Sequence, residues 1–433
     1  MSKQVVIAGG GWAGCAAALA ARRAGCDVML FERTDMLLGT GLVGGIMRNN
    51  GRFTAAEEMI ALGGGDLFTI TDATARHRNI AFPGHSHATL YDVATIEPAV
   101  KQALLAAGVT IRLQARVSDI KFAEGTVTGI RATLFGSDEI IATDGDAFVD
   151  ASGTAGPQGN CMKYGNGCAM CIYRCPTFGP RLSIGARAGV TEIIGSKPDG
   201  TYGAMSGSCK LLKESLSREI VEELDRTGVC VIPIPTALRK GGDSLAKKAC
   251  QQYALAEFAE NIILLDTGHA KLMSPYYPLD MLRSIPGFAN ARYEDPYAGG
   301  IGNSMRYIGM LPRDNALQVE GLTNVFAAGE KAGLLVGHTE AIVTGTLAGH
   351  NAARKAYGLP PLVLPDSLAV GDAISYVRDS MQTKTGLTKK YTFSGSVYFT
   401  RMQEKNLYTT DVATICDRVG RSGLAGIFAK PLI

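Results

Sequence analysis

The chain has 433 residues, a formal net charge of +3, 46% hydrophobic residues and 19% charged residues. This length is enough for two or three packed units, and the composition excludes an intrinsically disordered chain. The small net charge gives no global sign of a nucleic-acid partner. We find no export signal and no apolar, charge-free run of roughly eighteen residues, so we expect a cytoplasmic protein without a membrane segment.

The first thirty-two residues have the pattern of a dinucleotide-binding unit. Its parts are an apolar strand over 5–8, the spacing Gly9, Gly11 and Gly14, an Ala-rich helix over 15–24, a second strand over 27–31, and Glu32 at its end. Gly9 makes a tight turn, Gly11 lets the backbone approach a pyrophosphate, and Gly14 lets helix and strand pack closely. Glu32 is placed to accept hydrogen bonds from a ribose hydroxyl and would repel a 2′-phosphate. The unit predicts a site for NAD or FAD at a helix N-terminus.

Further elements follow along the chain. We expect a glycine-rich loop over 36–51 close to the ligand, a helix over 93–107, strands over 110–113, 116–122 and 126–134, a buried strand and turn over 146–153, helices over 215–227 and 244–263, a strand over 322–330 and a helix over 337–353. The long helix over 93–107 repeats apolar residues at helical spacing, whereas the strands are apolar runs bounded by glycine.

These elements predict an α/β fold with a Rossmann-like domain around a central parallel sheet and an inserted α+β substrate domain. We assign 1–153 and 320–372 to the Rossmann-like domain, 154–319 to the insertion, and 373–433 to a basic C-terminal region. That last region has nine Lys or Arg against four Asp or Glu from Ala373 onward. We interpret this excess as a solvated tail, the alternative being a surface for an anionic partner.

Three motifs together resemble the FAD-dependent oxidoreductase superfamily with a glutathione-reductase-like FAD fold. They are the opening fingerprint, the turn Asp150-Ala151-Ser152-Gly153, and the strand Asn324-Val325-Phe326-Ala327-Ala328-Gly329-Glu330. In that superfamily the acid after the last glycine holds a ribityl hydroxyl of the flavin, and Glu330 takes that place here. Because the motifs lie at both ends of residues 1–330, the resemblance implies FAD rather than NAD alone.

Within that superfamily the chain looks most similar to two groups of tRNA-modifying flavoproteins, the folate-dependent tRNA uracil-5-methyltransferases and the uridine carboxymethylaminomethyl-modifying enzymes. The likeness lies in the segment 285–291 and in the run from Ala328 to Pro361. The methyltransferases carry a cysteine in the segment after the second strand, where this chain has Gly41-Leu42-Val43-Gly44-Gly45. The resemblance therefore implies fold and cofactor, not substrate.

The fingerprint and the resemblance together give a set of expected FAD contacts, in which the helix beginning near Gly337 directs its N–H groups at the flavin pyrimidine edge. The set is Gly9, Gly11, Trp12, Ala13, Gly14, Glu32, Arg33, Gly41, Val117, Gly153, Gly329, Glu330, Gly337, His338 and Thr339. His338 is also a candidate catalytic residue, because it sits beside the presumed flavin helix.

Four of the ten cysteines lie within fifteen residues, at Cys161, Cys168, Cys171 and Cys175. The spacing from Cys168 to Cys175, followed by proline, resembles part of the bacterial ferredoxin run, which indicates an iron–sulfur cluster. A redox dithiol formed by Cys168 and Cys171, which are also catalytic candidates, is a second possibility. A zinc site or unrelated buried thiols are the others.

Two hypotheses of function follow. The first is an FAD-dependent oxidoreductase that moves electrons between a donor, either NAD(P)H or a protein, and an unknown acceptor through flavin and the four-cysteine centre. The second is a flavin- and folate-dependent RNA uracil methyltransferase or a relative of one. The basic C-terminal region favours RNA as a partner, whereas the small net charge and the missing cysteine near Gly41 oppose it, so we prefer a redox partner.

Overall fold

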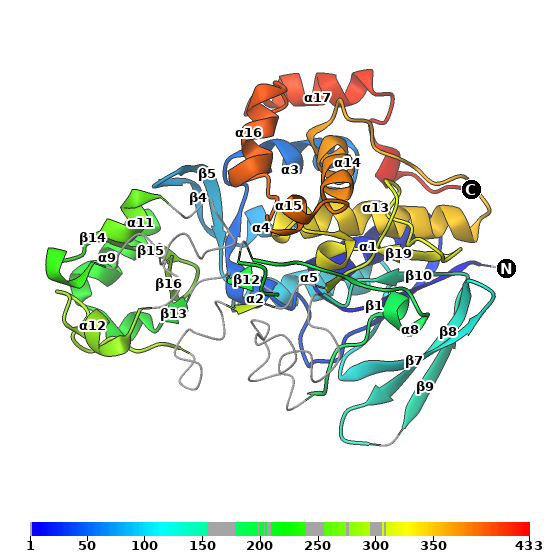
Figure 1. The fold of residues 1–433 in the computed structure, drawn as a ribbon, viewed down its shortest axis with the longest axis horizontal. Coiled ribbons are helices and arrows are strands. Elements are labelled where there is room, and N and C mark those ends of the chain that lie inside the picture. The colour runs from blue at the N-terminus through cyan, green and yellow to red at the C-terminus, as the bar shows by residue number, and fades with distance from the viewer. Residues whose placement is uncertain are drawn as a thin grey trace.

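A five-stranded parallel sheet forms the centre of the computed structural model (Figure 1). The structure describes residues 2–137, 139–153, 178–197, 199–202, 204–205, 209–239, 255–273, 277–294, 305–306 and 309–433. Across the sheet the order is β19 (Val325–Ala327), β10 (Ala147–Asp150), β1 (Gln4–Ala8), β2 (Asp27–Phe31) and β6 (Thr110–Arg112). The chain leaves β1 for β2 on one side and returns through β10 on the other, so the sheet has a topological switch point beside β1.

Two long helices cover one face of this sheet. These are α1 (Trp12–Arg23) and α13 (His338–Ala356), which lie together above the strands in Figure 1. Their close packing depends on small residues, because a Cβ atom at Gly345 or Gly349 of α13 would lie 2.2 Å from a backbone oxygen of α1. The Ala-rich sequence of α1 therefore brings α13, and the cavity residues at its N-terminus, directly against the opening β-α-β unit.

Antiparallel strands and further helices complete the Rossmann-like part. The three-stranded sheet of β7 (Ala115–Ala123), β8 (Thr126–Leu134) and β9 (Ile140–Asp144) lies on the side of the parallel sheet away from α13 in Figure 1. The other elements are α2 (Gly41–Gly44), β3 (Ile46–Met47), α3 (Gly51–Ala61), α4 (Asp66–Ala73), β4 (Ala75–Phe82), β5 (His85–Tyr91) and α5 (Ile96–Ala106). The strands and the helix expected over 93–134 are confirmed.

The inserted region has its own antiparallel sheet and its own core, seen on the left of Figure 1. The sheet order is β13 (Cys209–Leu211), β16 (Ala270–Leu272), β15 (Asn261–Asp266) and β14 (Val229–Pro233), with helices α9 (Arg218–Thr227), α11 (Ala256–Glu260) and α12 (Leu279–Arg283). Short elements connect it to the rest, namely α8 (Ile184–Arg187), β11 (Ile193–Ile194), β12 (Ala204–Met205), β17 (Met305–Arg306) and β18 (Gly309–Met310). This arrangement agrees with the predicted α+β insertion.

The predicted C-terminal end of one helix in the insertion is wrong. The apolar periodicity predicts helix over 244–263, but within the described residues helix α11 ends at Glu260 and strand β15 begins at Asn261. The run that follows pairs with β14 along its length, from Asn261 opposite Pro233 to Leu265 opposite Val229. A short apolar run fits a buried strand as well as a helix, and here strand pairing decides the outcome.

The C-terminal region is a packed helical layer, which corrects its interpretation as a solvated tail. It contains α14 (Ala369–Ser380), α15 (Lys384–Leu387), α16 (Ser396–Glu404) and α17 (Val412–Arg421). Glu58 of α3, which is fully buried, accepts hydrogen bonds at 3.0 Å from the backbone N–H groups of Ala369 and Val370. A carboxylate at that position caps the N-terminus of α14 and anchors the region to α3.

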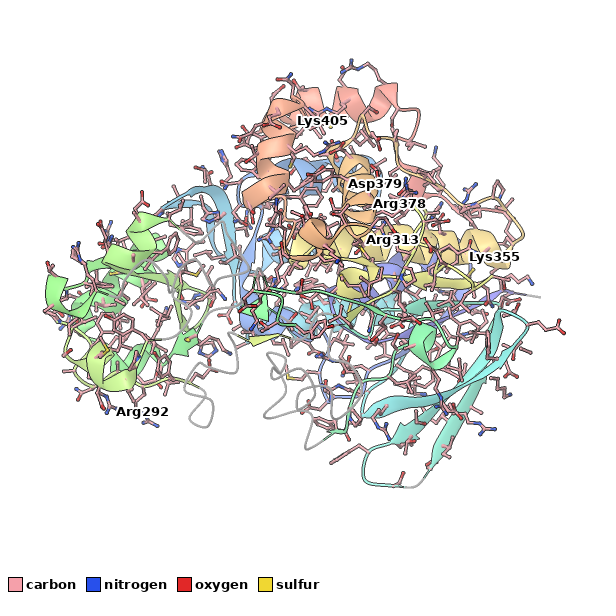
Figure 2. All side chains as sticks on the ribbon, in the orientation of Figure 1. Arg292, Arg313, Lys355, Arg378, Asp379 and Lys405 are labelled. Atoms are coloured by element: carbon pink, nitrogen blue, oxygen red, sulfur yellow. The ribbon has the colours of Figure 1, made fainter. Side chains whose placement is uncertain are left out.

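Several basic side chains of this layer are engaged in ion pairs with buried carboxylates. Arg401 and Lys405 both bind Asp372, and Arg418 binds Glu58 at 3.1 Å. Figure 2 shows Lys405 among these helices and Arg378 beside Asp379, with which Arg378 pairs at 2.7 Å. The excess of positive charge counted from the sequence is therefore partly neutralised by internal carboxylates and gives weak support for an anionic partner.

Among the described residues, no helix combines the length and the apolar character needed to cross a bilayer.

The buried histidine His350 lies in the middle of α13. It is fully buried, and neither ring nitrogen has a hydrogen-bond partner among the described residues. Its ring meets Phe428 edge-on with the centroids 5.1 Å apart. Burial, assisted by the charge of Arg354, lowers the pKa of His350 to about 4.

We expect His350 to make the protein less stable in acid. The unfolded chain takes up a proton on this group near pH 6.5 and the folded chain only near pH 4, so stability is present above pH 6.5 and lost as the pH falls. The slope in this window should be on the order of 1 kcal/mol per pH unit. Urea unfolding at pH 7 and pH 5 measures this slope, and His350→Phe should flatten it. An equal slope in the unchanged protein and in His350→Phe would contradict this assignment.

Candidate functional site

A cavity opens where four parallel strands end. The residues that follow β1, β2, β10 and β19 all line it, as expected for an α/β sheet, in which ligands bind beyond the carboxyl ends of the strands. The lining residues are Ala8, Gly9, Gly11, Trp12, Ala13, Phe31, Glu32, Arg33, Thr34, Leu38, Gly39, Thr40, Leu42, Ala115, Arg116, Val117, Ala151, Ser152, Gly153, Arg181, Leu182, Ala328, Gly329, Glu330, Gly337, His338 and Ala341. The empty space between them, which includes open solvent, is about 1210 Å³.

The glycine loop over 9–14 has two glycines, Gly9 and Gly14, that pack closely on backbone atoms and one, Gly11, that does not. Gly9 has a φ of +105°, and a Cβ atom there would lie 2.3 Å from the carbonyl oxygen of Ala151. A Cβ at Gly14 would lie 1.8 Å from the oxygen of Gly9. At Gly11, however, no described residue lies within 4 Å of an added Cβ, and Gly11 lines the cavity. The described residues therefore leave this position open to a ligand that approaches the backbone.

Two helices begin at the cavity. Gly11 is the N-cap of α1 and Gly337 the N-cap of α13, and neither helix has a side-chain cap. The first N–H groups of a helix have no intrahelical partner, and the helix dipole adds a partial positive charge. Both ends of the cavity wall therefore offer N–H donors, one set at the glycine loop and one set at His338.

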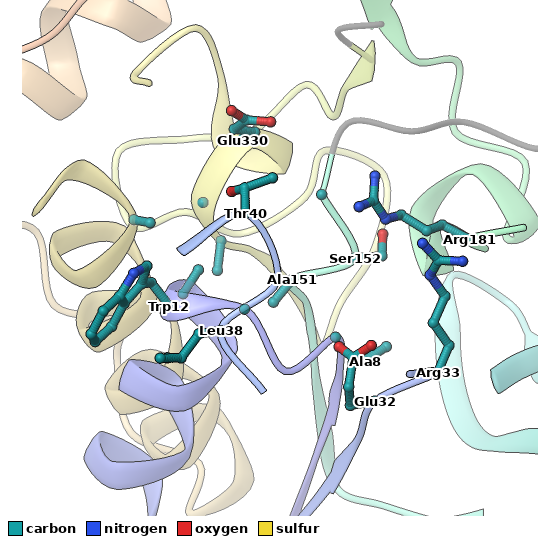
Figure 3. A pocket seen from close by; sticks show the side chains of 18 of the residues that line it. Ala8, Trp12, Glu32, Arg33, Leu38, Thr40, Ala151, Ser152, Arg181 and Glu330 are labelled. Atoms are coloured by element: carbon teal, nitrogen blue, oxygen red, sulfur yellow. The ribbon is translucent and has the colours of Figure 1, made fainter. Parts of the chain in front are cut away.

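Glu32 is held rigidly at the end of β2. It is 7% exposed, and its two carboxylate oxygens accept hydrogen bonds at 2.8 Å from the backbone N–H groups of Gly10 and Thr34. These bonds tie the carboxylate to the glycine loop, and each oxygen keeps a further lone pair for a hydroxyl donor. In Figure 3 the carboxylate lies beside Ala8, and both residues line the cavity.

Asp150 shapes the turn after β10. It is fully buried, and its Oδ1 accepts hydrogen bonds from the N–H and the hydroxyl of Ser152, at 3.2 and 2.6 Å. Its Oδ2 accepts a hydrogen bond at 2.8 Å from the Ser183 hydroxyl. The turn is thus fixed beside the guanidinium groups of Arg33 and Arg181, which Figure 3 shows on the same side of the cavity.

The segment after β19 brings the last predicted acid to the cavity. Gly329 donates its N–H to the Thr344 hydroxyl of α13 at 2.9 Å, and Glu330 lies at the opposite end of the view from Glu32 in Figure 3. Lys331, the next residue, is 1% exposed and forms an ion pair with Glu192 of the insertion. The turn that carries Glu330 is therefore fixed both to α13 and to the inserted region.

An aromatic side chain that the sequence did not indicate contacts His338 of the cavity wall. Tyr91 at the end of β5 is fully buried and donates its hydroxyl proton to the carbonyl oxygen of Gly41 at 2.6 Å. The hydroxyl oxygen of Tyr91 lies 3.2 Å from Nδ1 of His338, and the Tyr91 ring meets Trp12 edge-on. No motif contains Tyr91, because only the folded chain brings β5 next to α13.

The structure brings most of the expected FAD contacts to one cavity. Gly14, Gly41 and Thr339 are the exceptions. Gly14 packs on Gly9, Gly41 packs under Trp12, and Thr339 is fully buried with its hydroxyl 3.5 Å from the sulfur of Met47. Part of the expected glycine-rich loop over 36–51 lies at the cavity, since Leu38, Gly39, Thr40 and Leu42 line it.

The cysteine centre lies outside the described residues, because Cys161, Cys168, Cys171 and Cys175 all fall within 154–177. Within the part of the chain that the structure describes, no cluster of His, Cys, Asp or Glu is arranged to hold a metal ion. The iron–sulfur cluster, the dithiol and zinc all stay predictions from the sequence.

Two kinds of relatives match the chain over limited segments. It is 36% identical over 100 residues to methylenetetrahydrofolate–tRNA-(uracil-5-)-methyltransferase TrmFO of one strain of Thermus thermophilus, a match that covers 22% of this chain and 21% of that protein. It is 37% identical over 100 residues to the tRNA uridine 5-carboxymethylaminomethyl modification enzyme MnmG of another strain of the same species, covering 23% of this chain and 16% of that one. The matches therefore span about a fifth of each relative's length or less.

The fold and the family are shared over a greater length. The structure of Aquifex aeolicus GidA in its form II crystal superposes with a TM-score of 0.67 and 18% identity, covering 98% of this chain and 73% of that one. This confirms the predicted fold class. The family model described as GIDA, glucose inhibited division protein A, matches residues 4–233 and 251–360. The predicted resemblance to the tRNA-modifying flavoproteins is thereby confirmed, and the chain belongs to the GIDA family.

Proposed function

We propose that this protein is an FAD-dependent enzyme that modifies a uridine base of an RNA. The observation that carries the proposal is the cavity at the ends of four parallel strands, with an open position at Gly11, in a chain of the GIDA family. The uridine substrate is inferred from the tRNA uracil and uridine modifications named for the two Thermus relatives. These comparisons favour the hypothesis of a flavin-dependent RNA-modifying enzyme over that of an oxidoreductase with a four-cysteine centre.

The residues around the cavity fit FAD in their chemistry. The N–H groups at the start of α1 suit the pyrophosphate, and Glu32 suits the adenosine ribose. Glu330 is placed for the ribityl chain, and the start of α13 for the pyrimidine edge of the flavin. When bound, FAD would supply two-electron redox chemistry, while the chain itself binds, orients and shields the ring.

Gly11→Ala is the sharpest test of the cofactor site. The added methyl meets no described residue within 4 Å, and the φ of −65° at this position is ordinary for alanine, so the free energy of unfolding should change little. Binding of FAD should weaken at least about tenfold, since the backbone can no longer approach the pyrophosphate. The only tryptophan of the chain, Trp12, lines the cavity, so quenching of its fluorescence reports the binding.

Two further variants control this test. Gly420→Ala on α17 also adds a methyl that meets no described residue within 4 Å, and this variant should bind FAD like the unchanged protein. Gly14→Ala should destabilise the fold itself, because its Cβ would lie 1.8 Å from the oxygen of Gly9. If Gly11→Ala binds FAD as tightly as Gly420→Ala does, the proposed orientation of FAD along the glycine loop is wrong.

The uridine substrate needs a separate experiment. FAD-loaded protein is incubated with unmodified tRNA transcripts, NADH or NADPH, and methylenetetrahydrofolate, the donor named for one Thermus relative. We expect a uridine nucleoside of increased mass after digestion and mass spectrometry, which depends on FAD. Full FAD occupancy with unchanged nucleosides in every reaction would contradict the assignment to this donor and substrate class.

A redox function through the cysteines is the second candidate, supported by the spacing of Cys161, Cys168, Cys171 and Cys175 alone. Protein purified without oxygen is analysed for its visible spectrum, iron, zinc and acid-labile sulfide. Iron and sulfide together would support a cluster, whereas flavin without metal and with titratable thiols would support a dithiol. NAD(P)H enters either function as a transient electron donor.

A further inference from the structure

Arg313 is a buried cation that forms no ion pair with the described residues. Its side chain is 1% exposed, Nε donates to the carbonyl oxygen of Ala332 at 2.8 Å, and Nη1 donates to that of Asp314 at 3.1 Å. Nη2 has no hydrogen-bond partner among the described residues. Figure 2 shows Arg313 near Arg378 and Asp379, which pair with each other. Burial lowers the pKa of Arg313 to about 10, which still leaves the guanidinium charged at neutral pH.

A buried charge of this kind is costly for the fold. A guanidinium that is removed from water loses its hydration, and this loss is recovered only where ion pairs and hydrogen bonds replace the water. At Arg313 two backbone carbonyls replace part of it. An apolar side chain of similar volume would fill the same space without a buried charge, so packing alone does not explain this arginine. The two carbonyls that it holds indicate its role.

The segment that carries Arg313 is rigid. The backbone of Arg313 pairs with Val319 in an antiparallel bridge. Between them the carboxylate of Asp314 accepts hydrogen bonds at 2.9 Å from the N–H groups of Ala316 and Gln318. Because the guanidinium extends from a tight turn with its own hydrogen bonds, it can hold a distant carbonyl in one place.

The carbonyl of Ala332 belongs to a turn that forms part of the cavity wall. This 3₁₀ turn is η5 (Gly329–Ala332), and its first two residues line the cavity. The carbonyls of its last two residues are held by the segment after β18. The N–H of Leu311 donates to the oxygen of Lys331 at 2.9 Å, and Arg313 donates to the next oxygen along the turn. One segment outside the cavity lining therefore determines where the turn ends.

The residue after this turn packs against α14. Gly333 has a φ of +141°, and a Cβ atom there would lie 2.7 Å from Sδ of Met381 and 3.2 Å from Cγ1 of Val377. The same Cβ position is 3.9 Å from Nη2 of Arg313. The end of η5 thus lies between the guanidinium and α14. Without the guanidinium, one of these two supports is lost and the turn is free to shift.

We propose that Arg313 is a positioning residue for the flavin half of FAD. Its guanidinium holds η5, and the first two residues of this turn keep the shape of the cavity wall at the end away from Glu32. Figure 3 shows Glu330 at that end, and α13, whose start we assign to the flavin, follows η5 in the chain. The adenosine half, at the glycine loop and Glu32, does not depend on this turn. The inference rests on the proposed function.

The test compares two ligands in protein freed of cofactor. FAD occupies both halves of the proposed site, whereas ADP occupies only the adenosine half. Titration calorimetry gives both affinities for the unchanged protein and for Arg313→Met, which has a similar length but no donor. We expect FAD to bind about tenfold more weakly to the variant and ADP to bind within about twofold of the unchanged protein. Urea unfolding shows separately whether the variant is folded.

Two further variants make the result specific. Arg313→Lys keeps the charge, but its single nitrogen can hold only one of the two carbonyls, so it should recover part of the FAD affinity. Arg378→Met removes a nearby exposed ion pair with Asp379 and should leave both affinities unchanged. If Arg313→Met does not fold, Arg313→Lys carries the comparison, with FAD affinity reduced about threefold and ADP affinity unchanged.

The ratio of the two affinities decides between positioning and general support of the fold. An equal loss of FAD and ADP affinity in the Arg313 variants would assign Arg313 to the fold as a whole and would overturn the inference. Unchanged FAD affinity in a folded Arg313→Met protein would overturn it as well. In both cases FAD still binds the unchanged protein, so the proposed function stands. If FAD does not bind the unchanged protein, the proposed function fails and this inference fails with it.

Discussion

Replacing Glu340 with Gln should lower the free energy of unfolding by about 3–5 kcal/mol, because it leaves a buried guanidinium without its counter-ion. Glu340 is fully buried on α13, and Nε of Arg52 from α3 contacts its two carboxylate oxygens at 3.0 and 3.1 Å. The hydroxyl of Thr392 donates to the same carboxylate at 2.7 Å and the N–H of Phe393 at 2.9 Å. One carboxylate thus joins α13, α3 and the C-terminal layer.

The same substitution should weaken FAD binding. A Cβ atom at Gly337 would lie 2.0 Å from Oε2 of Glu340 and 2.2 Å from Nη2 of Arg52, so the ion pair lies directly against the N-cap of α13. When the pair is broken, the first turn of α13 loses its support and its N–H groups lose their fixed direction. Tryptophan quenching by FAD measures this effect, and the midpoint of urea unfolding measures stability.

A matched control comes from an ion pair of the same kind at the surface. Asp417 and Arg421 on α17 lie 3.1 Å apart, with side chains 69% and 71% exposed. Asp417→Asn should leave the urea midpoint and FAD binding unchanged, since solvent screens an exposed pair. Equal midpoints for Glu340→Gln and Asp417→Asn at the same slope would contradict a stabilising role for the buried pair.

The site residues that could be predicted from the sequence lie close to one another along the chain. Gly9, Gly11, Gly14 and Glu32 all fall within one β-α-β unit, in which the strand and helix periods and the glycine spacing specify the geometry. The residues after β10 and β19 could be predicted for a related reason. Parallel strands of one sheet end at the same edge, so a buried strand that ends in small residues brings them to the same cavity.

The rest of the site depends on contacts between distant segments. Tyr91 meets His338 across 247 positions, and Arg52 meets Glu340 across 288. Neither pair belongs to a local period or a spaced motif, because each residue would look equally ordinary in any buried strand or helix. The same holds for the C-terminal layer, where the count of basic residues gave no sign that Asp372 lies within reach of Arg401 and Lys405.

Replacing Asp266 with Ala should destabilise the junction between the Rossmann-like part and the insertion by about 2–4 kcal/mol. This is somewhat less than the loss expected for a fully buried ion pair, because its partner Arg76 is partly exposed to solvent. Asp266 is fully buried at the end of β15 and accepts hydrogen bonds from Lys213 at 2.7 Å, His77 at 2.8 Å and Arg76 at 2.9 Å. Arg76 and His77 belong to β4, whereas Lys213 belongs to the insertion. Without this carboxylate, three donors on two parts of the molecule lose their common acceptor.

The pH dependence gives an independent test of the same carboxylate. Burial alone would raise the pKa of Asp266, but the hydrogen bonds from Lys213, His77 and Arg76 outweigh it and hold the pKa below 3.8. The carboxylate therefore contributes stability above pH 3.8, and this stability is lost as the pH falls through the lowered pKa. Urea unfolding between pH 7 and pH 3 should show a steeper loss below pH 4 in the unchanged protein than in Asp266→Ala. Asp144→Ala, which removes an exposed pair with Lys121, should keep the urea midpoint of the unchanged protein at pH 7. If Asp266→Ala instead tracks Asp144→Ala, the cluster does not hold the two parts together.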